Sequence, residues 1–180
     1  MIIGIDPSLT GTAICTQEGD DPPQFELIST EKDKDLPPSV DYTFRLMKIR
    51  DGVRAAVENV KKVEFAAIEG ISFGSTGRLA ELGGLSYFIR EIFVEKKIPF
   101  IVIPPTVLKK YWCDKGNCAK IDMIKEALIR KIHIPYMKKY KGLELPDDNC
   151  VDSVAIVYFA KSYLNKELNG LEEKIERFGP

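Results

Sequence analysis

The sequence lacks the features that mark several specialised classes of protein. No apolar run approaches the roughly 18 residues that a membrane-spanning helix needs. No basic segment followed by an apolar stretch opens the chain as a signal peptide would. Internal repeats and low-complexity linkers are also missing. We therefore expect a globular cytoplasmic protein, and its 180 residues are enough for one full hydrophobic core.

Histidine and cysteine, which form most zinc sites, are scarce. The only histidine, His133, lies between isoleucines, so we expect it in the core or on the surface rather than in catalysis. Cys113 and Cys118 form a C-x4-C pair, whereas Cys15 and Cys150 stand alone. Because no second ligand pair of normal spacing is present, the pattern favours reduced thiols over a zinc site.

The net charge is small but unevenly distributed. It is −1 for the whole chain, which does not announce a nucleic-acid-binding protein. Residues 96–141 nevertheless hold twelve Lys or Arg against three acidic residues, while the rest of the chain holds 14 and 24. This asymmetry is typical of a basic face directed at a polyanion, although two oppositely charged solvated surfaces would produce the same counts.

Hydrophobic periodicity predicts one α/β domain with a mixed sheet. Three short strands come first, and helices then alternate with strands. The expected strands are 1–6, 12–16, 25–30, 64–70 and 99–105. The expected helices are 40–60, 78–95, 105–112, 120–131 and 149–163. The charged segment 31–39 carries two prolines and is expected to be a loop.

Two of the apolar strands end on acidic residues, Asp6 and Glu69. An unpaired carboxylate at the end of a buried strand costs several kcal/mol, so two at matching positions indicate an arrangement. If the strands are neighbours, both carboxylates lie at one edge of the sheet. The structural alternative for Asp6 is a role in forming the turn that follows it.

A third acidic cluster, PDDNCVDSVA, opens the last predicted helix. Asp148, Asn149 and Asp152 share a helical face because Asp148 lies four residues and Asn149 three residues before Asp152. Oxygen ligands of this kind suit Mg²⁺ or Mn²⁺ rather than zinc. Together with the strand acids they could hold two ions about 4 Å apart, as in two-metal phosphodiester hydrolysis. The alternative is that Asp147 or Asp148 only caps the helix.

Several of these segments resemble the RuvC family of Holliday junction resolvases, which belongs to the ribonuclease H-like superfamily. GIDPSLTGTAI, AAIEG and DDNCVDSVAIV are similar to its three acidic motifs, in that order and spacing. IPPTVLKKYWCDKGNCAKIDMI resembles its proline-led strand exit, Lys-Gly loop and Ala-x-Lys helix start, especially in phage-type members. The resemblance implies a nuclease domain over 1–164, followed by a charged helix or tail over 165–180. Its implied fold is ribonuclease H-like, with a mixed five-stranded sheet, three antiparallel first strands and helices on both faces.

The resemblance assigns catalytic metal ligands to Asp6, Glu69 and Asp152. The family's fourth ligand, usually Asp or His, lies three residues before the last of these, where this chain has Asn149. Either the amide of Asn149 coordinates weakly or Asp148 replaces it, and we expect Asp148. The glycine that usually follows the first-motif proline is Ser8 here, a small change in the turn.

Lysines supply the expected contacts to DNA. Lys115 and Lys120 match basic positions near the scissile phosphate in the family, and Lys120 is expected to act in catalysis. Lys109 and Lys110 are expected to follow the DNA backbone, together with Lys138, Lys139 and the rest of the run to Lys141. For any one of these lysines, simple surface solvation is the alternative.

The segment ISFGSTGR follows Glu69 directly and suits a loop that touches DNA. Phe73 is expected to stack on an unpaired base, or else to lie in the core, and Arg78 to contact a phosphate. Trp112 is expected to pack under the basic loop rather than act as a wedge in DNA.

One predicted helix, LAELGGLSYFIREIF, resembles the helix that pairs subunits in RuvC dimers. Gly83 and Gly84 each cost about 1 kcal/mol in a helix, which close backbone packing would justify. An apolar stripe runs through Leu82, Leu85, Phe88, Ile89 and Phe93. We expect a C2 homodimer through this helix, and core packing is the alternative.

The resemblance implies a Mg²⁺-dependent endonuclease that resolves Holliday junctions, or cuts related forks or flaps, with two ions per site and Mn²⁺ as a substitute. A weak or inactive binding module for branched DNA is the first alternative, supported only by Asn149. The second is a phosphotransferase of the actin and sugar-kinase superfamily, whose first strand also ends Gly-x-Asp. That superfamily needs two such domains, and this chain supplies one.

Overall fold

A computed structural model describes residues 1–71 and 79–179, which form one α/β unit. The strands of the main sheet are β1 (Ile2–Asp6), β2 (Gly11–Gln17), β3 (Gln24–Ser29), β4 (Phe65–Glu69), β5 (Phe100–Ile103) and β8 (Glu176–Phe178). The helices are α1 (Pro38–Asn59), α2 (Leu79–Glu95), α3 (Pro105–Cys113), α4 (Lys120–Ile129), α5 (Asp148–Leu164) and the short 3-10 helix η1 (Leu171–Lys174). A separate hairpin consists of β6 (Met137–Tyr140) and β7 (Leu143–Pro146).

The main sheet is mixed, as the sequence predicts, with the strand order β3-β2-β1-β4-β5-β8. The first three strands are antiparallel, and β1, β4 and β5 run parallel. The expected number of five strands is wrong, because β8 pairs antiparallel with the edge strand β5. Phe178 of β8 stacks on Phe100 with 5.3 Å between ring centroids. The segment after Leu164 therefore closes one edge of the sheet.

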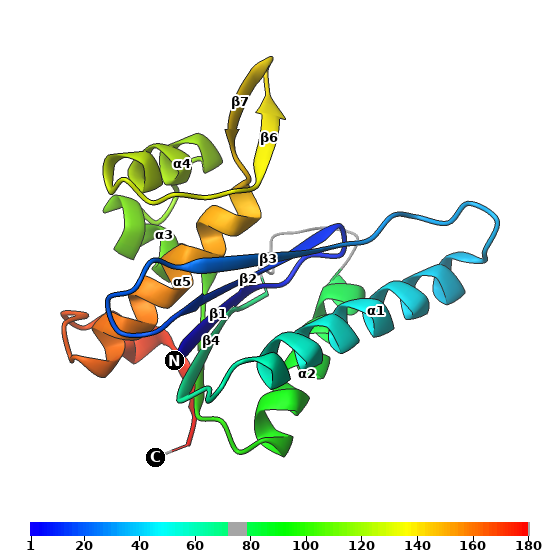
Figure 1. Cartoon of the computed structure of the whole chain (residues 1–180), viewed down its shortest axis with the longest axis horizontal. Coiled ribbons are helices and arrows are strands. Elements are labelled where there is room, and N and C mark those ends of the chain that lie inside the picture. Colours follow the sequence, from blue (N-terminus) through cyan, green and yellow to red (C-terminus); the bar gives the residue numbers. More distant parts are fainter. Residues whose placement is uncertain (72–78, 180) are drawn as a thin grey trace.

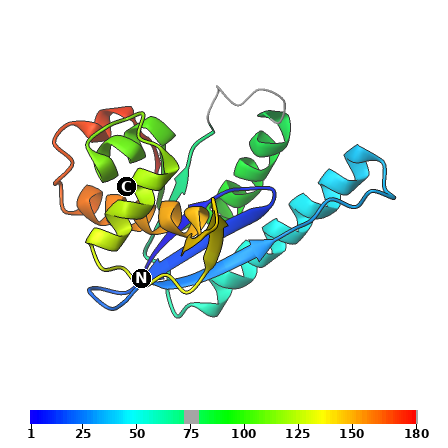
Figure 2. The ribbon, with the colours of Figure 1, turned by 90° about the horizontal axis from the view of Figure 1, so that it is seen from above.

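Helices cover both faces of the sheet. Figures 1 and 2 show α1 and α2 on one face and α3, α4 and α5 on the other. Each face has its own core of buried apolar side chains. Leu85, Ile89 and Phe93 of the α2 stripe are fully buried in the core on the α1 side, so for these three the packing alternative is confirmed.

The close approach of α5 to β1 depends on Gly4. A Cβ atom there would lie 2.7 Å from the backbone oxygen of Ser153 and 2.7 Å from Val157 Cγ2. Real Cβ atoms are essentially never found so close to another heavy atom. The glycine therefore lets the helix that carries Asp152 lie directly on the strand that ends at Asp6.

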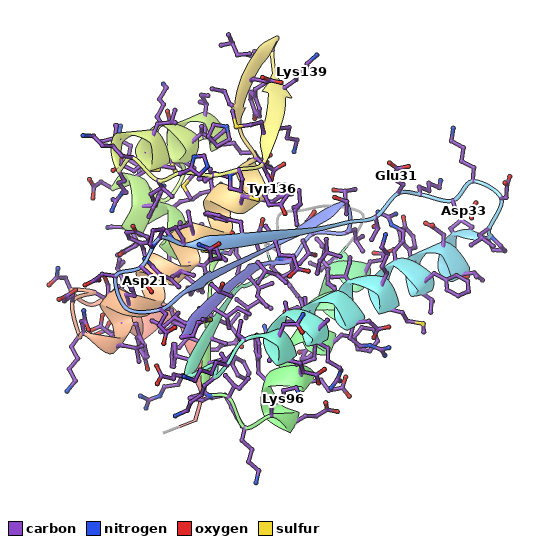
Figure 3. All side chains as sticks on the ribbon, viewed as in Figure 1. Asp21, Glu31, Asp33, Lys96, Tyr136 and Lys139 are labelled. Atoms are coloured by element: carbon purple, nitrogen blue, oxygen red, sulfur yellow. The ribbon has the colours of Figure 1, made fainter. Side chains whose placement is uncertain are left out.

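The hairpin β6–β7 was not predicted. It projects from the body of the molecule beyond the start of α5, with Tyr136 at its base and Lys139 on its outer part (Figure 3). Its two-residue turn, Lys141-Gly142, has φ angles of 48° and 88°. Positive φ at both central residues is typical of the tight turns that join antiparallel strands. The exposed segment KKYK therefore belongs to a folded projection.

Within the described ranges, no helix is both long enough and apolar enough to cross a membrane.

Candidate active site

The acidic residues of β1 and β4 meet at one edge of the sheet. β1 and β4 are parallel neighbours, with Ile5 opposite Ile68, so Asp6 and Glu69 end adjacent strands. Both line a pocket of about 340 Å³ that Asn149 and Asp152 of α5 also reach. The fold therefore brings the three acidic segments together, as predicted.

The turn after Asp6 is held in place from two sides. The backbone N–H of Ser8 donates to Thr12 Oγ1 (3.1 Å), and the Thr12 hydroxyl donates to the Ser8 carbonyl (2.8 Å). From α1, the buried Arg45 donates through Nη2 to the Leu9 carbonyl at 2.8 Å. These bonds fix the turn, and Asp6 lies in the strand directly before it.

The surroundings of the carboxyl groups in the pocket disfavour their charged form. Burial raises the pKa of Asp6 well above its ordinary range, and the charges of Glu69 and Asp152 raise it further. Burial likewise raises the pKa of Glu69, even though a hydrogen bond with Asp6 and the charges of Lys109 and Lys120 act in the opposite direction. Burial raises the pKa of Asp152 to about 8, with a contribution from Glu69. The positive charge near these three acids is therefore too small to offset the effect of burial on their pKa values.

The start of α5 brings Asn149 to the pocket. Asp147 is the N-cap, and its Oδ1 accepts hydrogen bonds from the backbone N–H groups of Asn149 (3.0 Å) and Cys150 (3.3 Å). The capping alternative thus holds for Asp147. The Asn149 side-chain amide donates to the Gly11 carbonyl at 2.8 Å, which leaves its oxygen available as an acceptor.

Asp148 lies differently from the fourth ligand that the sequence led us to expect. It is 3 % exposed, and in the part of the chain that the structure describes it is not among the residues lining the pocket. Its Oδ1 accepts from Lys138 Nζ at 2.7 Å and its Oδ2 from Lys120 Nζ. Burial alone would raise the pKa of Asp148, but the two ammonium groups outweigh it and hold the pKa below its ordinary value.

Two of the predicted DNA-contacting lysines, Lys109 of α3 and Lys120 at the start of α4, line the pocket. Burial lowers the pKa of Lys120, but Asp148 more than compensates and the pKa is raised, so the side chain is a stable cation. Among the described residues Lys110, Lys115 and Lys139 do not line the pocket. They lie on α3, in the α3–α4 loop and on the hairpin.

The structure describes some, but not all, of the aromatic and arginine residues for which the sequence predicts a role. Phe73 and Arg78 lie outside the described residues. Trp112 is buried, donates from Nε1 to the Met123 carbonyl at 3.1 Å and lies under the Arg130 guanidinium at 4.3 Å. It is the packing residue that the sequence predicts. His133 is exposed and, within the described ranges, does not line this pocket.

The donor set fits divalent cations that prefer oxygen. Three carboxylates and one amide oxygen converge on the pocket, and their mutual repulsion and burial are what a bound cation would relieve. Within residues 1–71 and 79–179, no three His, Cys, Asp or Glu side chains are yet grouped closely enough to hold a metal ion. A cation would therefore have to draw the carboxylates together as it binds.

Comparison with known proteins supports the fold. No family model matches the chain, and no curated protein matches its sequence. Thermus thermophilus RuvC in complex with a Holliday junction substrate is 19 % identical, with a TM-score of 0.65 over 93 % of this chain and 96 % of that one. The yeast mitochondrial Holliday junction resolvase Ydc2 is 17 % identical, with a TM-score of 0.56 over 96 % and 85 %.

A third solved structure, Fowlpox virus resolvase with substrate Holliday junction DNA, is 13 % identical, with a TM-score of 0.51 over 92 % of this chain and 99 % of that one. The molecule thus has the fold of RuvC-like resolvases over nearly its whole length. At these identities the likeness establishes the fold and not the activity.

Proposed function

We propose that the protein is a divalent-metal-dependent endonuclease that cuts branched DNA, with four-way junctions as its leading substrate. The observation that carries this proposal is the pocket where Asp6, Glu69 and Asp152 converge beside two lysines. The same three residues match the acidic motifs of the RuvC family, and the chain has the corresponding fold.

In this proposal, Asp6, Glu69 and Asp152 hold two Mg²⁺ ions, with Asn149 as a neutral fourth ligand. The ions, when bound, supply an activated water and stabilise the charge on the leaving oxygen. Asp6 and Glu69 lie at strand ends and Asp152 on a helix that packs on β1, so the backbone that carries them is rigid, and only their side chains would have to move to reach the ions. Lys120 and Lys109 offset negative charge that develops on the phosphate.

The DNA-binding surface in this proposal surrounds the pocket. The basic segment 96–141 supplies α3, the α3–α4 loop, α4 and the first strand of the hairpin. In this proposal Lys110, Lys115 and Lys139 contact phosphates of the duplex arms, while Lys109 and Lys120, which line the pocket, contact the reacting one. Such contacts give affinity that falls steeply with salt.

A homodimer remains part of the proposal. Although the buried stripe of α2 packs inside its own chain, Tyr87 and Val94 on the same helix are exposed. A Cβ at Gly84 would meet Leu46 Cδ1 at 3.8 Å, an ordinary contact. The described residues therefore do not require glycine there, and in this proposal the reason for it is close contact with a partner helix. Two sites related by a twofold axis match the approximate symmetry of a four-way junction.

A labelled four-way junction incubated with the protein and Mg²⁺ tests the proposal. Asp6→Asn removes one charge from the pocket, and the exposed Asp51→Asn is the matched control. We expect wild type and D51N to cut and D6N to bind without cutting. Binding without cleavage in all three proteins would identify a binding module, which the neutral Asn149 in the pocket favours as the second candidate. ATP turnover without junction binding would overturn both.

A further inference from the structure

The carboxylate of Asp148 joins two segments that are distant in sequence. It accepts from Lys120, the first residue of α4, and from Lys138 in the first strand of the hairpin. The Asp148 side chain is 4 % exposed, while the side chains of Lys120 and Lys138 are 55 % and 49 % exposed. A buried carboxylate is thus neutralised by two half-exposed ammonium groups.

One of these lysines belongs to the pocket. Lys120 lines it beside Asp6, Glu69 and Asp152, whereas Asp148 does not in the described part of the chain. A lysine stem has four rotatable bonds, so its ammonium group needs a fixed partner to stay in one place. Asp148 is the hydrogen-bonded partner that Lys120 has in this structure. Its position therefore sets where the Lys120 ammonium group lies.

The other lysine belongs to the hairpin. Lys138 and Tyr140 lie on one face of β6 because alternate residues share a face, and Leu143 and Leu145 lie opposite them in β7. That face is turned toward Asp148, since Lys138 reaches it at 2.7 Å. Leu145 packs against the core, and the backbone N–H of Asp147 donates to the Tyr136 carbonyl at 2.9 Å. The hairpin is thus fastened at its base, close to Asp148.

We propose that Asp148 is a positioning residue rather than a metal ligand: it holds Lys120 at the pocket and the β6–β7 hairpin beside it as one unit. This inference rests on the proposed nuclease function for its effect on catalysis. Its geometric part, the bridge itself, does not depend on that function. The consequence is that the site's basic residue and the projecting hairpin have a fixed spacing.

The kinetic test compares Asp148→Asn, Asp148→Glu, Lys120→Met and the double variant D148N/K120M. We expect D148N to lower kcat roughly 10- to 100-fold, as loss of a residue that orients a catalytic group does, without weakening junction binding. D148E should recover part of the loss, because it restores the charge. In the K120M background, D148N should have no further effect on kcat. A full additional loss in the double variant would overturn the proposal.

Metal binding provides a readout that does not need cleavage. Mn²⁺ binding to the protein alone, measured by calorimetry in the K120M background, should be unchanged by D148N and lost in Asp152→Asn. Loss of Mn²⁺ affinity in D148N would make Asp148 a ligand and contradict the inference. If wild type cuts no branched DNA, the proposed function fails while this measurement still decides the role of Asp148.

Lys138→Met, at a half-exposed position, covers the case in which the D148N variant does not fold. Breaking this half of the bridge should accelerate tryptic cleavage after Lys139 and Lys141. The exposed Lys125→Met on α4 is the matched control. Equal cleavage rates in wild type and K138M would show that the bridge does not hold the hairpin.

Discussion

Asp148 and Asp152 lie one turn apart on α5, yet their surroundings differ in kind. Burial disfavours the charge of both. Two lysines hold the pKa of Asp148 below its ordinary value, whereas Glu69 and burial together raise that of Asp152 to about 8. The first carboxylate is neutralised within the protein, and the second is not. We therefore take a buried carboxylate as a candidate metal ligand when no lysine or arginine is hydrogen-bonded to it, as for Asp152 among the described residues.

Replacing Asp152 or Asp148 with asparagine should have very different effects on cleavage. Asp152→Asn should abolish junction cleavage, with a loss on the order of 10³-fold or more, because it removes a metal ligand of the proposed mechanism. Asp148→Asn should lose much less. Single-turnover rates on a labelled junction measure both. Equal losses in the two variants would erase the distinction between the two acids.

Stabilisation of the protein by metal should depend on Asp152 and not on Asp148. A cation that binds the folded state alone contributes about 2.7 kcal/mol at 100 times its Kd. For a chain of this size, this corresponds to a rise in Tm of roughly 5–10 °C. D152N should lose the rise and D148N should keep it, which thermal scans with Mg²⁺ and with chelator will show. A metal-induced rise in D152N would remove Asp152 from the ligand set.

Without metal, the two acids should depend on pH with opposite signs. The folded-state pKa of Asp152 is raised to about 8, so its destabilising effect grows as pH rises from about 4 to 8. The pKa of Asp148 is lowered, so its contribution is present above its unfolded value and is lost as pH falls through the folded one. In chelator at pH 8, D152N should therefore melt roughly 5 °C higher than wild type, and D148N lower.

Chemical denaturation across the same pH range checks the sign. A D152N protein that melts below wild type at pH 8 in chelator would mean that this carboxylate has a cationic partner.

The smallest expected effect concerns two neighbouring lysines of the hairpin, which differ in the same way as the two acids. Lys138 is held by Asp148, whereas Lys139 is exposed on the opposite face of β6. Lys139→Ala should weaken junction binding only a few-fold and reduce the slope of log affinity against log salt by about one. Its Tm should match wild type. Binding titrations at several salt concentrations measure the slope, and an unchanged slope would remove Lys139 from the DNA-binding surface.

The sequence was sufficient for the acidic centre because each of its residues lies at or near the end of a recognisable element. Asp6 and Glu69 close apolar strands, and Asp152 lies one turn inside an apolar helix, so their convergence follows from a parallel pair and the helix packed on it. The position of Asp148 outside the pocket lining did not follow. It depends on Lys120 and Lys138, which lie 28 and 10 residues away in the chain.

Two further elements escaped prediction for different reasons. The hairpin strand MKKY has no apolar alternation, and its signal was the Lys141-Gly142 turn. Strand β8 is only three residues long and exposed, and it exists because β5 offers an edge with which it can pair. Short strands are set by what lies beside them, which a local pattern does not contain.

Gly4 has a consequence for the dimensions of the proposed metal site. With no methyl group between β1 and α5, the helix rests on backbone, and this contact sets how far Asp152 stands from Asp6. Two ions that share a phosphate must be spaced to a fraction of an ångström. The distance between Asp6 and Asp152 thus depends on Gly4, two residues before Asp6, because this residue has no Cβ atom.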